Sequence, residues 1–259
     1  DFGFGHDVLL QMGLAAPYAF LIATQPMRRQ VVAAVAILAG YWLLFFTHPV
    51  PPVPAGIPPD WTPFTGLFAH WNRYGNFAAD FDGWFLNLFP RPTPFQNDDL
   101  GLATLNFVPT IVTMVVGAMA GALLRSSVPS RDKIRRLALA GVGCVLTGWL
   151  LSLTVCPLVK LIWTPSWTIF SAGWALLTVM LLHWVVDIQG MRRWTYGFVV
   201  LGVNALFVYL LLHLFSPWMW TTVSKHFGAI SYTLELFIVN GVTWLAAAWL
   251  HKRRVLLTA

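Results

Sequence analysis

Apolar residues fall into seven long stretches along the chain, separated mostly by short polar connections. These stretches span residues 7–24, 31–47, 102–124, 136–155, 166–186, 194–215 and 232–250. A helix needs about 20 mostly apolar residues to cross a bilayer, whereas a strand of a membrane barrel alternates apolar and polar positions. Residues 31–39 are apolar on every face. The pattern predicts an all-α polytopic membrane bundle with seven transmembrane helices, forming a single unit over residues 1–259.

The connections differ in their basic residues, and this difference predicts an orientation. Twelve of the 16 bases lie in connections on one side, namely Arg28, Arg29, Arg125, Arg131, Lys133, Arg135, Arg136, Arg192, Arg193, Lys252, Arg253 and Arg254. The other side has Arg73, Arg91, Lys160 and Lys225. Short cytoplasmic loops are enriched in Lys and Arg. We therefore expect the N-terminus outside and the C-terminus in the cytoplasm, in a bacterial-type inner membrane.

The composition agrees with a chain that uses the lipid bilayer as its main partner. Hydrophobic residues make up 58% and charged residues 10% of the 259, with a mean hydropathy of +0.68. So few polar residues cannot coat a soluble domain. The net charge of +6 follows from the orientation signal, so no nucleic-acid partner is expected. The chain opens on an acidic segment without the basic region of a signal peptide, and we expect that segment to be internal to a longer protein.

The long connection over residues 48–101 is predicted to lie on the outer, periplasmic side. It begins with a proline-rich stretch and continues into residues 76–88, where Phe77, Phe81, Trp84, Phe85 and Leu88 form one helical stripe. This spacing predicts an amphipathic helix that lies in the outer interface or caps the bundle. Tryptophans at the same predicted level form either an outer aromatic belt or a platform for stacking sugars; they are Trp61, Trp71, Trp163, Trp167, Trp218 and Trp220.

A small-residue motif, Gly117-Ala-Met-Ala-Gly121, lies within the third apolar stretch. Motifs of this kind let two membrane helices approach closely. We expect it to pack against another helix of the same chain, with a homodimer contact as the alternative. The two cysteines are too far apart along one predicted helical run for a disulfide, and no metal-ligand spacing is present.

Polar side chains gather in the outer half of the predicted spans. Buried ionisable or strongly polar groups in a membrane are functional candidates by default. The candidate substrate-binding residues are Asn106, Lys160, Trp163, Ser166, Asn204, His213 and Glu235. They predict a polar cavity that opens outward, with its floor near Asn204, although for any single Asn or Ser ordinary hydrogen bonding between helices is the better explanation.

No arrangement of residues identifies a catalytic centre, so the catalytic residues are left unknown. His70 is the best general-base candidate in the outer loop, because a histidine titrates near neutral pH. An exposed loop histidine without a function is the competing explanation. Whether the chain is an enzyme is therefore open at this level.

Several runs together resemble the transmembrane acyltransferase-like family of heparan-alpha-glucosaminide N-acetyltransferase and its bacterial relatives. The runs are residues 8–14 (VLLQMGL), 76–90 (NFAADFDGWFLNLFP), 104–121 (TLNFVPTIVTMVVGAMAG), 156–167 (CPLVKLIWTPSW), 184–194 (WVVDIQGMRRW) and 202–205 (GVNA). The resemblance implies a polytopic bundle that passes an acetyl group from cytoplasmic acetyl-CoA, as co-substrate, to an amino sugar outside.

The same resemblance places the family's catalytic histidine before the segment that matches Val8 onward, and His70 does not match it. Two hypotheses follow. The chain is part of such an acyltransferase, incomplete as given, or it is a non-catalytic accessory subunit of this fold in a larger respiratory or photosynthetic membrane complex. A transporter would be expected to show inverted repeats and broken helices, and the sequence predicts neither.

Overall fold

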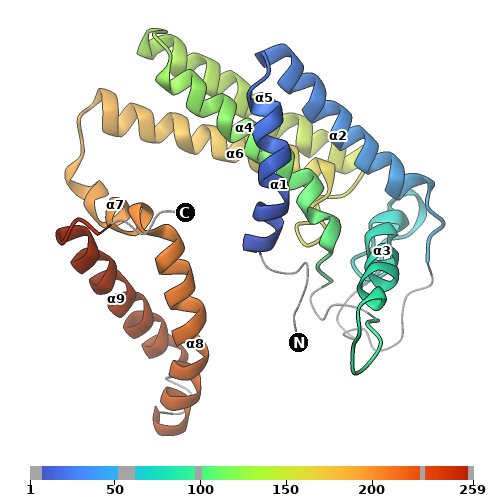
Figure 1. The fold of residues 1–259 in the computed structure, drawn as a ribbon. Helices are drawn as coiled ribbons and strands as arrows, with labels where there is room; N and C mark the ends of the chain where they lie inside the picture. The colour runs from blue at the N-terminus through green and yellow to red at the C-terminus, as the bar shows by residue number, and fades with distance from the viewer. Residues whose placement is uncertain (1–7, 52–61, 97–100, 228–230, 256–259) are drawn as a thin grey trace. The chain divides into compact units, whose positions relative to one another are not determined.

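The chain folds into helices joined by turns and short irregular segments (Figure 1). The computed structural model describes residues 8–51, 62–96, 101–227 and 231–255, and these contain no strand. They divide into two compact units at residues 184 and 185. Each unit is described by itself, and the prediction of one bundle over the whole chain stays a prediction.

The first unit is built on five long apolar helices. These are α1 (Val8–Ala23), α2 (Met27–Thr47), α4 (Phe107–Arg125), α5 (Ser130–Thr154) and α6 (Pro165–Leu182), the last continuing into the π-helical turn η4 (His183–Ile188). Shorter elements are η1 (Gly66–Trp71), α3 (Phe77–Phe85), η2 (Leu86–Leu88) and η3 (Thr104–Asn106). Helix α1 packs on α4, and α6 contacts α5, α4 and α2.

The second unit contains η5 (Arg193–Thr195), α7 (Tyr196–Val203), α8 (Ala205–Phe227) and α9 (Ser231–Lys252). Helix α9 packs against both α7 and α8. Val200, Val239 and Ala247 are buried between them.

Within the part of the chain that the structure describes, four helical segments are long and apolar enough to cross a membrane: 27–47, 104–125, 130–154 and 165–188. A fifth is present if residues 193–203 and 205–218 count as one span, while α1 is apolar but only 16 residues long. The chain is therefore an all-helical protein whose apolar helices suit a bilayer. Seven spans and the orientation of the termini stay predictions.

The predicted span over residues 194–215 is wrong as a continuous helix. It bends by 72° between α7 and α8, where Asn204 leaves the helical region with φ −119° and ψ 38°. The sequence predicted no broken helices, and this prediction is wrong at Asn204.

The closest helix pair is α5 with α6, and glycines allow it. A Cβ at Gly173 would lie 2.6 Å from the Val145 nitrogen, and one at Gly148 would lie 2.6 Å from the Phe170 nitrogen. Gly117 behaves differently, because a Cβ there would meet nothing within 4 Å. The predicted close packing of Gly117 on another helix of the chain is thus wrong for the described residues.

Candidate functional site

Segments distant in sequence meet at one end of the first unit. We call this the loop end; it comprises the C-terminal turns of α2, the described residues of 62–106, and residues 155–168. The Tyr41 hydroxyl donates a hydrogen bond to the Ile162 carbonyl (3.2 Å), and Trp42 Nε1 donates to the Val155 carbonyl (3.4 Å). A buried cluster joins the three parts, and its members are Tyr41, Phe45, Trp71, Ala78, Ala103, Cys156 and Ile162.

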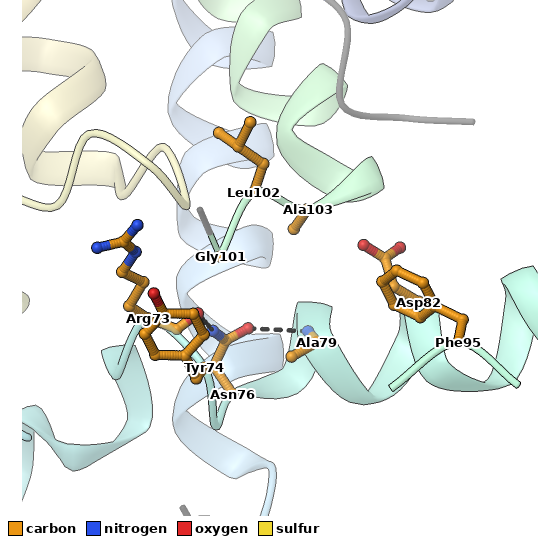
Figure 2. Close-up of a pocket in the computed structure, with 9 residues that line it drawn as sticks. All are labelled: Arg73, Tyr74, Asn76, Ala79, Asp82, Phe95, Gly101, Leu102 and Ala103. Atoms are coloured by element: carbon orange, nitrogen blue, oxygen red, sulfur yellow. Dashed lines mark hydrogen bonds between the residues drawn. The ribbon is translucent and has the colours of Figure 1, made fainter. Parts of the chain in front are cut away.

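Helix α3 is held at its start by Asn76. The Asn76 Oδ1 accepts hydrogen bonds from the Ala78 and Ala79 amides (2.8 and 3.0 Å), the second of which appears in Figure 2. Its Nδ2 donates to the Asn72 carbonyl at 2.6 Å. Asparagine is among the strongest N-cap residues, because its oxygen satisfies amides that have no partner inside the helix.

The side of α3 that packs on the protein overlaps the predicted apolar stripe only in part, through Phe77. Ala78, Asp82 and Leu86 are buried, while Trp84 and Leu88 are exposed. The location of this helix at a membrane surface stays a prediction, and Trp84 and Leu88 are the side chains available for it.

The carboxyl group of Asp82 links α3 to the start of α4. Asp82 is 1% exposed, and its Oδ2 accepts a hydrogen bond from the Thr104 amide at 2.8 Å. A buried carboxylate is costly unless hydrogen-bonded, so this contact fixes the two segments together. Beside it lies a small cavity bordered by Arg73, Tyr74, Asn76, Ala79, Asp82, Phe95, Gly101, Leu102 and Ala103 (Figure 2). Its volume of about 10 Å³ has room for about one water molecule.

The segment between α5 and α6 is organised by two buried hydroxyl groups. Thr164 Oγ1 and Ser166 Oγ both donate to the Pro157 carbonyl, at 2.8 and 2.9 Å. The Cys156 thiol lies 3.5 Å from Ser166 Oγ and forms no disulfide. Burial raises the pKa of the Cys156 thiol, and the weaker opposing effect of the Ser166 contact does not reverse this. These contacts serve the shape of the loop.

Four of the predicted site residues lie at the loop end. Asn106 is buried, and its Nδ2 donates to the Leu161 carbonyl at 2.8 Å. Ser166 is fully buried, Trp163 is half-buried with a left-handed φ of 51°, and Lys160 is exposed. Asn106 and Ser166 thus bind backbone carbonyl groups of one loop, as the structural explanation of such residues expects.

The remaining predicted residues belong to the second unit. Asn204 is fully buried, and its Nδ2 lies 3.4 Å from the Val255 carbonyl. His213 is exposed; its Nδ1 contacts the Tyr209 carbonyl at 3.0 Å, and the His213 and Tyr209 rings lie tilted with centroids 4.0 Å apart. The side chain of Glu235 lies outside the described residues. A cavity shared by Asn204 with the loop end stays a prediction.

The tryptophans predicted to form a belt or a sugar platform divide between different surroundings. Trp71 is fully buried, so it fits neither role. Trp167 is half-buried and Trp218 exposed. Trp61 and the side chain of Trp220 lie outside the described residues.

A histidine–aspartate pair at the loop end was not predicted. His48 Nε2 lies 2.7 Å from Asp80 Oδ2, and both side chains are partly exposed. His70, the predicted general base, instead directs its Nδ1 to the His48 carbonyl at 3.1 Å. A carboxylate that accepts a hydrogen bond from one imidazole nitrogen leaves the other nitrogen free to take up a proton. No spacing rule links His48 to a residue 32 positions later. The one available indication was that both residues were predicted to lie in the same outer connection.

Comparisons with known proteins supply no family for this chain. Its sequence matches no model of a known protein family and no curated protein.

Proposed function

We propose that the chain is a membrane acyltransferase-like protein, which passes an acetyl group from cytoplasmic acetyl-CoA to an amino sugar outside a bacterial-type inner membrane. The observation that carries this proposal is the meeting of three resembling runs at the loop end. Asp82 of the first run accepts from Thr104 of the second, and Asn106 of the second donates to Leu161 of the third. Buried polar contacts between such runs support one shared site.

The His48–Asp80 pair supplies a group for the acceptor half of this reaction. The neutral amine of the sugar attacks the thioester carbonyl carbon, so the C–N bond forms as the C–S bond breaks, and the nitrogen loses one proton as it becomes an amide. His48 Nδ1 takes this proton, Asp80 stabilises the imidazolium, and the imidazolium then gives the proton to the departing CoA thiolate. This role rests on geometry alone, because the resemblance matches no residue of this chain to the family's histidine.

Acetyl transfer in proteoliposomes tests the proposal. With acetyl-CoA on one side and glucosamine on the other, we expect His48→Gln to lower the rate by about 100-fold, within the usual range for a general base. His70→Gln is the matched control, since its Nδ1 is bound to a backbone carbonyl, and it should retain most of the rate. Equal rates for the two variants would contradict the role of His48, and no transfer by the wild-type protein would contradict the enzyme.

A specific observation favours a second function, a non-catalytic accessory subunit of a larger membrane complex. Asn106 and Ser166 are closed off from solvent by packing, and the loop-end cavity holds about one water molecule. Residues so placed stabilise the fold without touching a substrate. Isolation in a mild detergent distinguishes the two functions, because a subunit should co-purify with other membrane chains in fixed ratio, whereas the enzyme should be active without them.

A further inference from the structure

An apolar groove lies between α4 and α6. It is lined by Thr113, Val116, Gly117, Ala120, Gly121 and Leu124 of α4 and by Ser171, Ala172, Ala175, Leu176 and Val179 of α6. Its volume is about 420 Å³, within the range of about 300–1,000 Å³ that small-molecule sites occupy. Behind it Ala120, Leu137 and Leu176 form a buried cluster. The groove is therefore a formed feature with a packed floor.

The lining offers no side-chain hydroxyl that is not already hydrogen-bonded within its own helix. Its two hydroxyl groups are used within their own helices, Thr113 Oγ1 donating to the Thr110 carbonyl and Ser171 Oγ to the Thr168 carbonyl. All other lining residues are apolar or glycine. A sugar or a nucleotide would lose its hydrogen bonds with water here without replacement, so the lining suits a hydrocarbon.

The dimensions fit one extended chain and not a helix. Residues 113–124 of α4 rise by about 16 Å. Dividing the volume of about 420 Å³ by this length gives a mean cross-section of about 25 Å². A helix with its side chains is at least about 10 Å across and needs about 80 Å². An extended acyl chain can therefore lie within the groove, whereas a helix of a second copy would rest across its opening.

Positive charge gathers at the Leu124 end of the groove. The Arg125 Nη2 lies 3.8 Å from the position of a Cβ on Gly121. Residues 125–136 hold five bases and one acid, and Lys133 Nζ donates to the Leu124 carbonyl at 2.6 Å, which brings the start of α5 to this end. Arg131 and Arg135 are exposed there. The N-terminus of α5 is the positive end of its helix dipole, and the basic side chains there add to this positive charge. Binding of an anion at this end of the groove is therefore favoured.

We infer that the groove binds one acyl chain of an anionic phospholipid, with the phosphate at Arg125 and the basic start of α5. The apolar trough accounts for the chain, and the basic end accounts for the headgroup. Basic pockets between membrane helices on the cytoplasmic side are suited to anionic headgroups, and this is the side to which the orientation prediction assigns residues 125–136.

Native mass spectrometry of the full chain tests the inference, after release from nanodiscs of phosphatidylcholine with one quarter phosphatidylglycerol. We expect the wild-type protein to retain one phosphatidylglycerol in preference to phosphatidylcholine. Gly117→Leu should fill the groove and lower this retention at least fivefold. The matched control is Gly143→Leu on α5, because a Cβ at Gly143 also meets nothing within 4 Å and Gly143 does not line the groove.

A second pair of variants tests the headgroup. Arg125→Ala should weaken phosphatidylglycerol retention about fivefold, while Arg28→Ala, an exposed base on α2, should not change it. Equal retention of the two lipids by the wild-type protein, or equal retention by Gly117→Leu and Gly143→Leu, would overturn the inference. So would a dimer that Gly117→Leu separates while the retained lipid stays unchanged.

Discussion

Helix α6 meets a neighbour on two sides, and the two contacts differ. On the α5 side, Gly148 and Gly173 bring backbone against backbone, with no space for a single added carbon. On the α4 side, Gly117 and Gly121 line an open groove of about 420 Å³. Small residues occur on both sides, so composition does not decide which pair closes. Close packing requires that each glycine lie directly opposite the backbone of its partner.

The strongest test of this comparison is Gly173→Leu. A Cβ there would lie 2.7 Å from the Gly141 carbonyl oxygen as well as close to Val145, and backbone atoms cannot move aside as a side chain can. We expect a loss of about 3 kcal/mol or more in stability, measured as thermal unfolding in detergent. A variant as stable as Gly143→Leu would show that α5 and α6 are not closely packed.

A smaller loss is expected where η3 meets the segment between α5 and α6. Asn106→Ala removes the hydrogen bond to the part-buried Leu161 carbonyl, which costs about 1 kcal/mol. Asn240 serves as the control, because it is exposed and bonds within its own helix to the Leu236 carbonyl. Comparable melting temperatures for Asn106→Ala and Asn240→Ala would contradict the structural role of Asn106.

On the open side the expected sign reverses. Gly117→Ala adds a methyl group where nothing lies within 4 Å, and alanine restricts the unfolded chain more than glycine does. Stability should rise by about 0.5–1 kcal/mol. Destabilisation in the same unfolding assay would mean that another group already occupies the space beside Gly117.

The last test does not change stability; it measures how accessible the loop end is from the reaction rate of the Cys156 thiol. Because burial raises the pKa of the Cys156 thiol, less of it is thiolate at pH 8 than in an exposed cysteine. With Cys144 replaced by serine, alkylation of Cys156 by iodoacetamide should be at least about tenfold slower than alkylation of the cysteine in Ser127→Cys. The rate at Cys156 should increase only above the ordinary thiol pKa of about 8.5. Equal rates would show that the loop end is open.

Hydropathy alone was sufficient to locate α2, α4, α5, α6 and α9, because an apolar run of about 20 residues has few alternatives to a helix. It did not locate α8, which continues to Phe227 although the predicted stretch ended at residue 215. It could not detect the bend at Asn204, where an apolar run continues through a change in backbone direction. It also assigned close packing to Gly117. The sequence shows that a residue is small, but what faces it depends on the rotation of both helices.

The candidate site was predicted in part for the same reason. Asn106 and Ser166 were recognised as buried polar groups, since such groups are costly in an apolar run. Their partners, the Leu161 and Pro157 carbonyls, belong to main-chain atoms that every residue has, so no sequence signal marks them. The His48–Asp80 pair was missed because it depends on the path of the chain between α2 and α3.

The bond from Tyr41 to Ile162 also sets an order of events during synthesis. Its two residues are 121 positions apart, and a ribosome adds about 5–20 residues per second. Ile162 is therefore synthesised about 6–24 s after Tyr41, and the hydrogen bond cannot form before then. Asn76, by contrast, bonds to residues two to four positions away and caps its helix as soon as that helix emerges. The nascent loop end therefore has local order, but it lacks the contact between α2 and residue 162 until the chain has been synthesised to that point. During these seconds proteases and chaperones have access to it.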